Sequence, residues 1–442
     1  MSENTALAPG DRILSGMSRE GVGVHPDQTI RGLWTLCVPM FFVTFSVCIL
    51  ESWQIFQLFV TTCCLMVFLV SNLKELRNVD RSLALITFLY LFPWFLSSSV
   101  GVIGTMLSSD SSAIVAMSPY GRLFNVILMA LYLLGVSMCR KSYAYLSAKL
   151  QKAYFFGCMF LLVSAIWQAM DMYTSFPMAF PFHTRSYVHG AEDLSLDLKG
   201  RLTGYAAEPS YICPFIADGL LLSLYYIKDK SIRVAIVSLF VGVMYLTYSP
   251  SGYITIAVLA MVWLFGFTRS RKGRMWLLFA LLSLFVLFLS MEDTDAMQYI
   301  NRRIDDYEGT SRFNGIVGPI EHQFSYGSWT NILFGYGTKG MSSFYDLGNR
   351  DFVFGTSNTL FADVLFDAGI IGLICYVVLF LLLFLRSIKC LSNTDFPLLL
   401  FVDLFVTSLY RADYASLRFV ALVAIIYSST SSYTQKRYLI RK

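Results

Sequence analysis

Long apolar runs alternate with short polar segments along most of the chain. Twelve such runs can be read, and several are shorter than the ~20 residues of a usual membrane-spanning helix. They lie at residues 33–50, 53–70, 82–105, 122–139, 153–172, 210–227, 232–248, 252–267, 275–290, 366–385, 396–410 and 415–430. The pattern predicts an all-α polytopic membrane protein with about 12 transmembrane helices.

The connections between these runs alternate in charge. Every second one is basic, and with Arg12, Arg19 and Arg31 these segments hold most of the 34 Lys and Arg residues. They read KELRNVDR (74–81), RKSYAYLSAKLQK (140–152), KDKSIR (228–233), RSRKGR (269–274), RSIK (386–389) and, in the tail, KRYLIRK (436–442). The connections near 51, 106–121 and 249–251 hold none. By the positive-inside rule, we expect both termini to be cytoplasmic and the other face to be extracytoplasmic.

Composition supports this class of protein. The chain is 56% hydrophobic and 14% charged, against about a quarter charged in soluble proteins, and its mean hydropathy is +0.59. The net charge of +5 follows membrane sidedness and gives no indication of nucleic acid. The polar N-terminal segment carries Asp11 and Glu20, so it does not read as a cleaved signal peptide. We expect a cytoplasmic segment 1–32, one transmembrane domain 33–430 and a cytoplasmic tail 431–442.

Cysteine and histidine give no indication of a disulfide framework or a metal centre. All cysteines except Cys213 lie in apolar runs or at basic helix ends, and no pair falls in the long polar connections. The four histidines form no close cluster with cysteine or aspartate. We therefore expect neither a metal nor another cofactor.

Two outer connections are long, at about 173–209 and 291–365, and both are rich in aromatic residues and glycine. Their aromatics suit a packed lid or a sugar ring, although interfacial anchoring explains any single one equally well. Within 309–327 an apolar stripe at helical spacing predicts an amphipathic helix on the membrane surface, capped by Thr310 or Ser311, ended by Gly327 and kinked into two pieces by Pro319. The stripe consists of Phe313, Ile316, Ile320 and Phe324.

Arginines in these outer connections run against the positive-inside bias, so some interaction should hold them there. A guanidinium binds phosphate through two parallel hydrogen bonds and stays charged at any relevant pH. Several of them would suit a lipid-linked diphosphate at the membrane surface. The alternative for each is an ion pair with acids of the same loop, such as Asp305 or Glu308. The outer arginines are Arg185, Arg201, Arg302, Arg303, Arg312 and Arg350.

The stretch NILFGYGTKG (331–340) is glycine-rich but has no Walker pattern, so we interpret it as a turn that brings backbone close to substrate or lid. Asn358 is placed to cap the following helix. In that helix Asp363 and Asp367 lie one turn apart above the hydrocarbon, and the glycines at 369 and 372 permit close helix packing.

Charges also occur within the apolar runs. Asp403 interrupts one run, and Arg418 lies near the start of the last. Intramembrane charges are costly and are either functional or paired. We expect a structural pair of Asp403 with Arg418 or with Arg411. Of the outer histidines, His183, His189 and His322 are each candidates for a general base, although a single loop histidine is usually just solvated.

Several of these stretches together resemble the O-antigen polymerase and ligase superfamily of bacterial integral membrane proteins. RLTGYAAEPS (201–210) resembles the R-x-x-G-x-x-x-E-P signature through Arg201, Gly204, Glu208 and Pro209. YSPSGYI (248–254) is similar to the Ser/Gly turn of the family. SRFNGIVGPIEHQFSYGSWTNILFGYG followed by SNTLFADVLFDAGIIGL resembles the large outer loop of the family and the helix after that loop. The resemblance therefore covers about 200–375.

The resemblance implies a GT-C-type glycosyltransferase that uses undecaprenyl-pyrophosphate-linked oligosaccharides as donor and acceptor on the outer face of the inner membrane. Family ligases carry a histidine before the Asn of the second motif, whereas this chain has Ser357, which favours a polymerase. In this scheme Arg201, Arg312 and Arg303 bind the pyrophosphate, and Glu208 is the base or a brace for Arg201. Arg312 is also a catalytic candidate through the leaving group. No metal is needed, because arginines supply the charge.

We assign substrate or lid contacts to Gly204, Asn358, His322 and Tyr336. A chain-length regulator is a candidate partner besides the lipid bilayer. Two alternatives stay open. One is an O-antigen ligase that transfers finished polymer to a lipid A core. The other is a transporter or flippase for lipid-linked sugar, which the long outer loops and nearly apolar runs disfavour.

Overall fold

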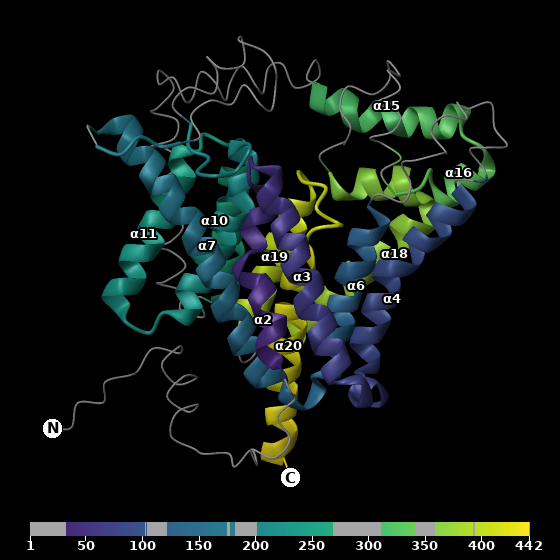
Figure 1. Ribbon diagram of the computed structural model, residues 1–442, viewed down its shortest axis with the longest axis horizontal. Coiled ribbons are helices and arrows are strands. Elements are labelled where there is room, and N and C mark those ends of the chain that lie inside the picture. The colour runs from purple at the N-terminus through teal and green to yellow at the C-terminus, as the bar shows by residue number, and fades with distance from the viewer. Residues whose placement is uncertain are drawn as a thin grey trace.

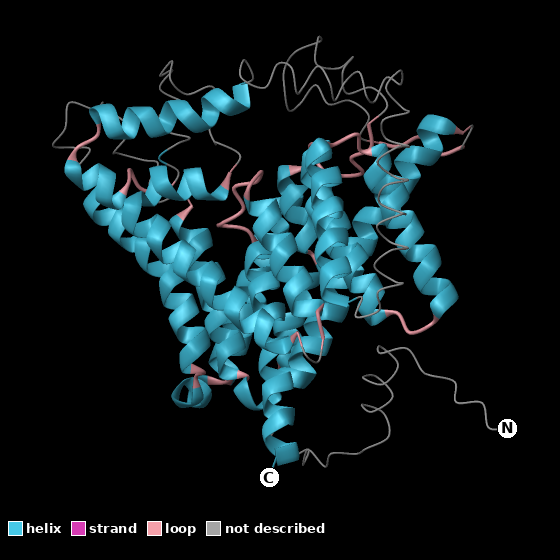
Figure 2. Cartoon of the chain, turned by 180° about the vertical axis from the view of Figure 1, so that it is seen from behind, coloured by secondary structure: helices cyan, strands magenta, loops and turns pink. Residues whose placement is uncertain are grey.

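The structure is a computed structural model that describes residues 32–101, 103, 122–174, 177–181, 201–267, 311–338, 340, 359–391 and 394–441, with the side chains of 265–267, 311–315 and 433–441 left out. The described residues are almost entirely helical (Figure 2), and their one β-bridge joins Cys48 to Ala206. The all-α prediction is therefore confirmed for this part of the chain.

The helices follow the apolar runs. Each predicted run coincides with a helix except 275–290, which lies outside the described residues. In chain order they are α2 (Leu33–Phe41), η2 (Val43–Val47), α3 (Glu51–Ser71), η3 (Leu73–Asn78), α4 (Arg81–Leu96), η4 (Ser97–Gly101), α6 (Leu123–Met138), η6 (Arg140–Ser142), α7 (Tyr143–Tyr173), α10 (Pro209–Tyr226), α11 (Lys230–Leu246), α12 (Pro250–Phe267), α15 (Ser311–Tyr326), α16 (Trp329–Phe334), α18 (Leu360–Cys390), α19 (Phe396–Ser408) and α20 (Leu417–Arg441).

Four stretches of helix are long and apolar enough to cross a membrane, namely Glu51–Ser71, Arg81–Gly101, Arg140–Tyr173 and Leu360–Cys390. Shorter apolar helices cover Leu33–Val47, Leu123–Met138, Pro250–Leu264, Phe396–Ser408 and Leu417–Ser432. These helices support a membrane protein, while the count of twelve spans stays a prediction.

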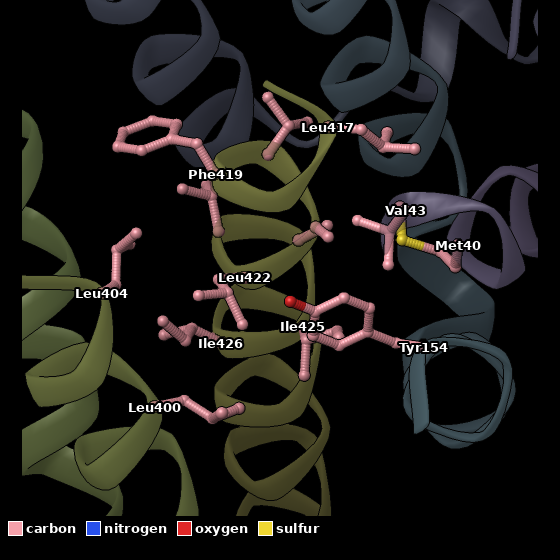
Figure 3. Packing of buried hydrophobic residues seen from close by; sticks show 14 of the residues in the cluster. Met40, Val43, Tyr154, Leu400, Leu404, Leu417, Phe419, Leu422, Ile425 and Ile426 are labelled. Carbon is pink, nitrogen blue, oxygen red and sulfur yellow. The ribbon is translucent and has the colours of Figure 1, made fainter. Parts of the chain in front are cut away.

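The first part of α20 is the axis of the bundle. Its side chains from Leu417 to Thr430 are all buried, and α7, α18 and α19 pack around it. Figure 3 shows Leu422 and Ile426 of this helix facing Leu400 and Leu404 of α19. A helix that is apolar on all sides is stable only when it is surrounded by protein or lipid.

One prediction about a connection was wrong. The basic stretch 140–152 is not a loop, because after the short η6 the helix α7 begins already at Tyr143. Tyr143, Leu146 and Leu150 share one face at helical spacing and are buried. Lys149 and Lys152 keep their charges on the exposed face, where their apolar stems can cover neighbouring surface.

The basic connections among the described residues gather at one end of the bundle, which we call the basic end (Figure 1). There Tyr427 Oη donates to Asp80 Oδ1 at 2.9 Å, Arg386 donates to Thr430 and Ser431, and Tyr225 donates to Asp395. The connections at 48–50, 201–208, 247–249 and 409–416, with α15 and α16, lie at the opposite end. The two kinds of connection are thus separated in space as their charge alternation predicts.

At the opposite end α15 lies across the bundle (Figure 1). Its last residue is Tyr326 and Gly327 follows, as predicted. The predicted break at Pro319 is wrong, since α15 runs continuously from Ser311 to Tyr326 with this proline inside. Gln323 anchors the helix by donating from Nε2 to the carbonyls of Asn331 and Leu365, both at 3.0 Å, which ties α15 to α16 and α18.

Candidate functional site

The segment 201–208 lies against the turn between α11 and α12. The Arg201 guanidinium donates from Nε to the carbonyl of Thr247 and from Nη2 to the carbonyl of Tyr248, both at 3.0 Å. The backbone N–H of Leu202 donates to Leu246 O, also at 3.0 Å. These two bonds to backbone carbonyls fix the position of the guanidinium.

Gly204 makes the turn that the sequence predicts. Its φ is +53°, and a Cβ there would collide with Ser164 Oγ on α7. Gln168, one turn further along α7, accepts from the N–H groups of Thr203 and Gly204 through Oε1, both at 2.8 Å. Only glycine combines this left-handed backbone with so close an approach to a neighbouring helix. The segment is therefore held on the scaffold.

Glu208 occupies the N-cap position of α10, and Pro209 is the first residue of that helix. This is the helix start that the sequence predicts. Glu208 is half-buried and accepts from Ser210 Oγ through Oε2 at 3.1 Å. A carboxylate at a helix N-terminus interacts favourably with the helix dipole. The Glu208 carboxylate can accept a proton or brace a cation.

The connection between α19 and α20 crosses the same end. Arg411 lies over the Tyr211 ring at 4.4 Å from the centroid and donates from Nη1 to Tyr211 O at 3.3 Å. Its ion pair is with Asp413 at 2.7 Å. The sequence offered Arg411 as one of two partners for Asp403, and that option is wrong. Arg411 instead links this connection to the first turn of α10, next to Glu208.

Further along the same connection, Tyr414 lies in a rigid setting. Its Oη donates to Asp367 Oδ2 at 2.9 Å and accepts from Arg122 Nη1 at 3.4 Å. Its ring stacks on Trp94 at 4.2 Å between centroids. Burial, followed by the negative charge of Asp367, raises the pKa of the Tyr414 phenol well above its usual value. The phenol therefore keeps its proton and remains a donor to Asp367.

Asp367 lies where α18 is interrupted. Gly369 has φ +68° and ψ −171°, so the chain leaves the helical conformation there before resuming it. The carbonyls of Phe366 and Asp367 accept instead from the N–H groups of Tyr336 and Gly337, at 3.1 and 3.0 Å. Buried backbone groups that leave a helix need other hydrogen-bond partners, and the loop after α16 supplies them.

Three glycines make this junction possible. A Cβ at Gly335 would collide with the backbone of Asp367, one at Gly369 with the backbone of Leu333, and one at Gly101 with the carbonyl of Gly335. The stretch 331–340 was predicted to bring backbone close to substrate or lid. In the structure it brings backbone against α18 and η4. Ser97 of η4 also donates to the carbonyl of Asp367.

We expect Gly335→Ala to destabilise the protein by about 1–3 kcal/mol, because it combines overpacking with a φ of +77° that alanine adopts poorly. Thermal unfolding of the purified protein in detergent measures this. Gly242→Ala is the matched control, since no atom lies within 4 Å of a Cβ at that position in α11. The control should be neutral or slightly stabilising through helix propensity. Equal melting temperatures for the two variants would contradict the junction's importance.

Two predicted substrate or lid residues pack in the corner formed by α15, α16 and α18. Tyr336 is 1% exposed and stacks on Phe366 at 4.7 Å between ring centroids. His322 is 9% exposed, with its ring 5.4 Å from that of Tyr326 and 6.4 Å from that of Tyr336. Both residues therefore pack inside this corner, and their substrate or lid role, like an acid–base role for His322, stays a prediction.

The structure holds Arg201, Gly204 and Glu208 in one segment against α7, α10 and the turn after α11, and it places the backbone of Arg312 in the first turn of α15. Arg303, Asn358 and the side chain of Arg312 lie outside the described residues. The predicted cap of α18 is corrected, because the N-cap is Thr359, whose hydroxyl accepts from Ala362 N at 3.2 Å.

Sequence reasoning missed Arg122 and Tyr414. Arg122 is the N-cap residue of α6 at the end opposite the basic connections. The signal was available, since this arginine also runs against the positive-inside bias, but it falls just inside an apolar run and not in a loop. Nothing in the sequence near Tyr414 distinguishes it from the many other tyrosines.

A comparison with protein-family models gives one finding. A family described as O-antigen ligase matches residues 235–377, which run from α11 through α12, α15 and α16 to beyond the interruption of α18. A search of curated proteins finds no match. The matched part includes the turn that holds Arg201 and two of the three junction glycines, Gly335 and Gly369. Residues 235–377 of the chain are therefore similar to the O-antigen polymerase and ligase superfamily.

Proposed function

We propose that the protein polymerises undecaprenyl-pyrophosphate-linked oligosaccharide repeat units into O-antigen or another surface polysaccharide. The reaction would take place at the extracytoplasmic face of the inner membrane, with both termini of the chain cytoplasmic. The opposite end of the bundle, away from the basic connections, would then face outward. The match of residues 235–377 to the O-antigen ligase family supports a glycosyltransferase-like enzyme, and the absence of nucleotide sugars outside the cell requires a lipid diphosphate donor.

The observation that carries the proposal is the fixed position of Arg201. Two backbone carbonyls hold its guanidinium at the end of the bundle where a lipid-linked substrate would meet the protein. A preorganised cation is most effective where negative charge grows in the transition state. In glycosyl transfer from a lipid diphosphate, that charge grows on the leaving pyrophosphate. Arg312 and Arg303 are proposed to add to it.

The reaction balances without further reactants. The oxygen of an acceptor hydroxyl forms a bond to the anomeric carbon of the donor, and the bond from that carbon to the pyrophosphate oxygen breaks. The electron pair leaves with the lipid pyrophosphate, and the hydroxyl proton passes to a base. We assign the base to Glu208, which lies at the start of α10 beside the arginine segment. Its alternative role is to brace Arg201.

A ligase is the second candidate, because the matched family is described as O-antigen ligase. Ser357 favours the polymerase, since it stands where the resembling ligases carry histidine. The two enzymes use the same kind of donor but differ in acceptor. A polymerase transfers to another lipid-linked repeat, whereas a ligase transfers to a lipid A core.

Purified protein incubated with a defined lipid-linked repeat should produce a ladder of products that differ by one repeat. A ligase should give no ladder with this substrate alone and should transfer sugar only when a lipid A core is added. Electrophoresis of the labelled products distinguishes the two outcomes. A protein that gives neither product from active substrate would contradict the proposed function.

A further inference from the structure

Arg122 has many unused hydrogen-bond donors. Within the described part of the chain the one hydrogen-bond partner of its guanidinium is Tyr414, at 3.4 Å, and the guanidinium has no ion-pair partner there. Its Cζ lies 5.8 Å from the centroid of the Tyr414 ring, and the side chain is half-buried. A guanidinium carries five N–H donors in a fixed planar array. Most of them can therefore bind an external acceptor.

The side chain that orients Arg122 is itself fixed. Tyr414 is held by its stack on Trp94, by the bond from its Oη to Asp367, and by the bond that its carbonyl accepts from Tyr90 Oη at 2.7 Å. Because the phenol of Tyr414 donates its hydrogen bond to Asp367, the lone pairs of the phenol oxygen are left to accept from Arg122. The arginine is thus preorganised, which lowers the entropic cost of binding an anion.

Arg122 and Arg201 lie on two flanks of the same end of the bundle. Arg122 precedes α6, which packs on α4, whereas Arg201 is held by the turn after α11, which packs on α10 (Figure 1). The connection 409–416 joins the flanks, since Arg411 contacts α10 through Tyr211 and Tyr414 contacts α18 through Asp367. The opposite end therefore offers two separately held arginines.

The proposed polymerase needs two such places. Its donor and its acceptor each carry a diphosphate, and each is tied to the bilayer by a lipid chain. The donor diphosphate leaves during the reaction, whereas the acceptor diphosphate remains bonded to its sugar. Two lipid-anchored anions cannot occupy one site at the same time, and each must approach from the lipid at the edge of the bundle.

We infer that Arg122 binds the diphosphate of the lipid-linked acceptor, while Arg201 serves that of the donor. This inference rests on the proposed function. Tyr414 is the positioning residue for Arg122. Because no bond breaks at the acceptor diphosphate, Arg122 contributes to acceptor binding and not to the chemical step.

The test uses full-length protein in phosphatidylcholine nanodiscs and a donor whose non-reducing hydroxyl is blocked. One acceptor is a lipid-linked repeat with a methylene group in place of the anomeric oxygen, so that it keeps its phosphates and cannot act as donor. The other is the same repeat as an allyl glycoside without phosphate. KM and kcat are measured with each acceptor.

Arg122→Ala should raise the KM of the phosphate-bearing acceptor about tenfold or more and leave its kcat within about twofold. The KM of the allyl glycoside should change less than about twofold. Tyr414→Phe, which keeps the aromatic stack and loses the oxygen, should raise the same KM by a smaller factor. Arg201→Ala should lower kcat with both acceptors.

Three results would overturn the inference. The first is an unchanged KM of Arg122→Ala for the phosphate-bearing acceptor, and the second is an equal rise in KM for both acceptors. The third is a rise in KM that appears for both acceptors only in nanodiscs with phosphatidylglycerol, which would identify a bilayer headgroup as the occupant. If Arg122→Ala does not purify as a folded protein, Arg122→Lys and Tyr414→Phe are judged by the same criteria. Absence of product from the wild type would overturn the proposed function itself, and is distinguishable because it needs no variant.

Discussion

Arg201→Ala is expected to abolish the ladder of products, with turnover falling by about 100-fold or more. The guanidinium is fixed in position by the carbonyls of Thr247 and Tyr248. Arg201→Lys should also be poor, because an ammonium cannot reproduce the planar array that binds two phosphate oxygens. The measurement is product formation by purified protein at matched concentration.

Two further variants complete that experiment. Arg233→Ala removes an arginine that also donates to a backbone carbonyl, that of Ile227 at 3.5 Å, but at the basic end, and it should leave the ladder intact. Glu208→Gln separates the two roles of Glu208. The amide of Glu208→Gln cannot act as a base, so the ladder should be lost if Glu208 is the base. The amide can still accept a hydrogen bond, so the ladder should largely remain if Glu208 only braces Arg201. A normal ladder from Arg201→Ala would refute the assignment of the donor site.

The positions of the helices were predictable because a membrane-spanning segment needs apolar side chains along its whole length, a requirement that leaves a strong local pattern. The ends were less predictable. A helix continues as long as it has a face to bury, and α7 begins at Tyr143 because that face packs on α20 through Tyr427. The contact with α20 and Tyr427 cannot be recognised from the sequence of the basic stretch 140–152 alone.

The segment 201–208 shows which features of a site can be predicted from the sequence. Gly204 and Pro209 each fix their own backbone, so the turn and the helix start were correctly predicted. The partners that position Arg201 come from the turn after α11, more than one helix away, and no local rule gives them. The site residues in undescribed segments stay predictions.

Contacts between distant segments were the least predictable. The glycine junction joins η4, α16 and α18, and each glycine alone reads as a flexible turn or a packing position. The buried pair of Asp403 and Arg418 was predicted and is confirmed, at 2.9 Å. Its closer partner was missed, since Asp218 on α10 lies 2.7 Å from Arg418 and 200 positions away in the chain.

This buried network gives the largest expected effect on stability. Asp218, Asp403 and Arg418 are at most 1% exposed and join α10, α19 and α20 in the interior of the bundle. Tyr154 of α7 donates to Asp218 as well. Arg418→Met should lower the free energy of unfolding by about 3–5 kcal/mol, because it leaves two buried carboxyl groups without their cation. Denaturant titration of the purified protein in detergent measures the loss.

The combined variant Arg418→Met, Asp218→Asn, Asp403→Asn should recover much of that loss, because removing all three charges leaves no uncompensated ion. Arg411→Met is the comparison, since its pair with Asp413 is 14% and 13% exposed, and it should lose less stability than Arg418→Met, whose pairs are at most 1% exposed. If Arg418→Met were no less stable than Arg411→Met, the network would not hold the bundle together. If the triple variant were as unstable as the single one, specific hydrogen bonds and not charge balance would be the source of its stability.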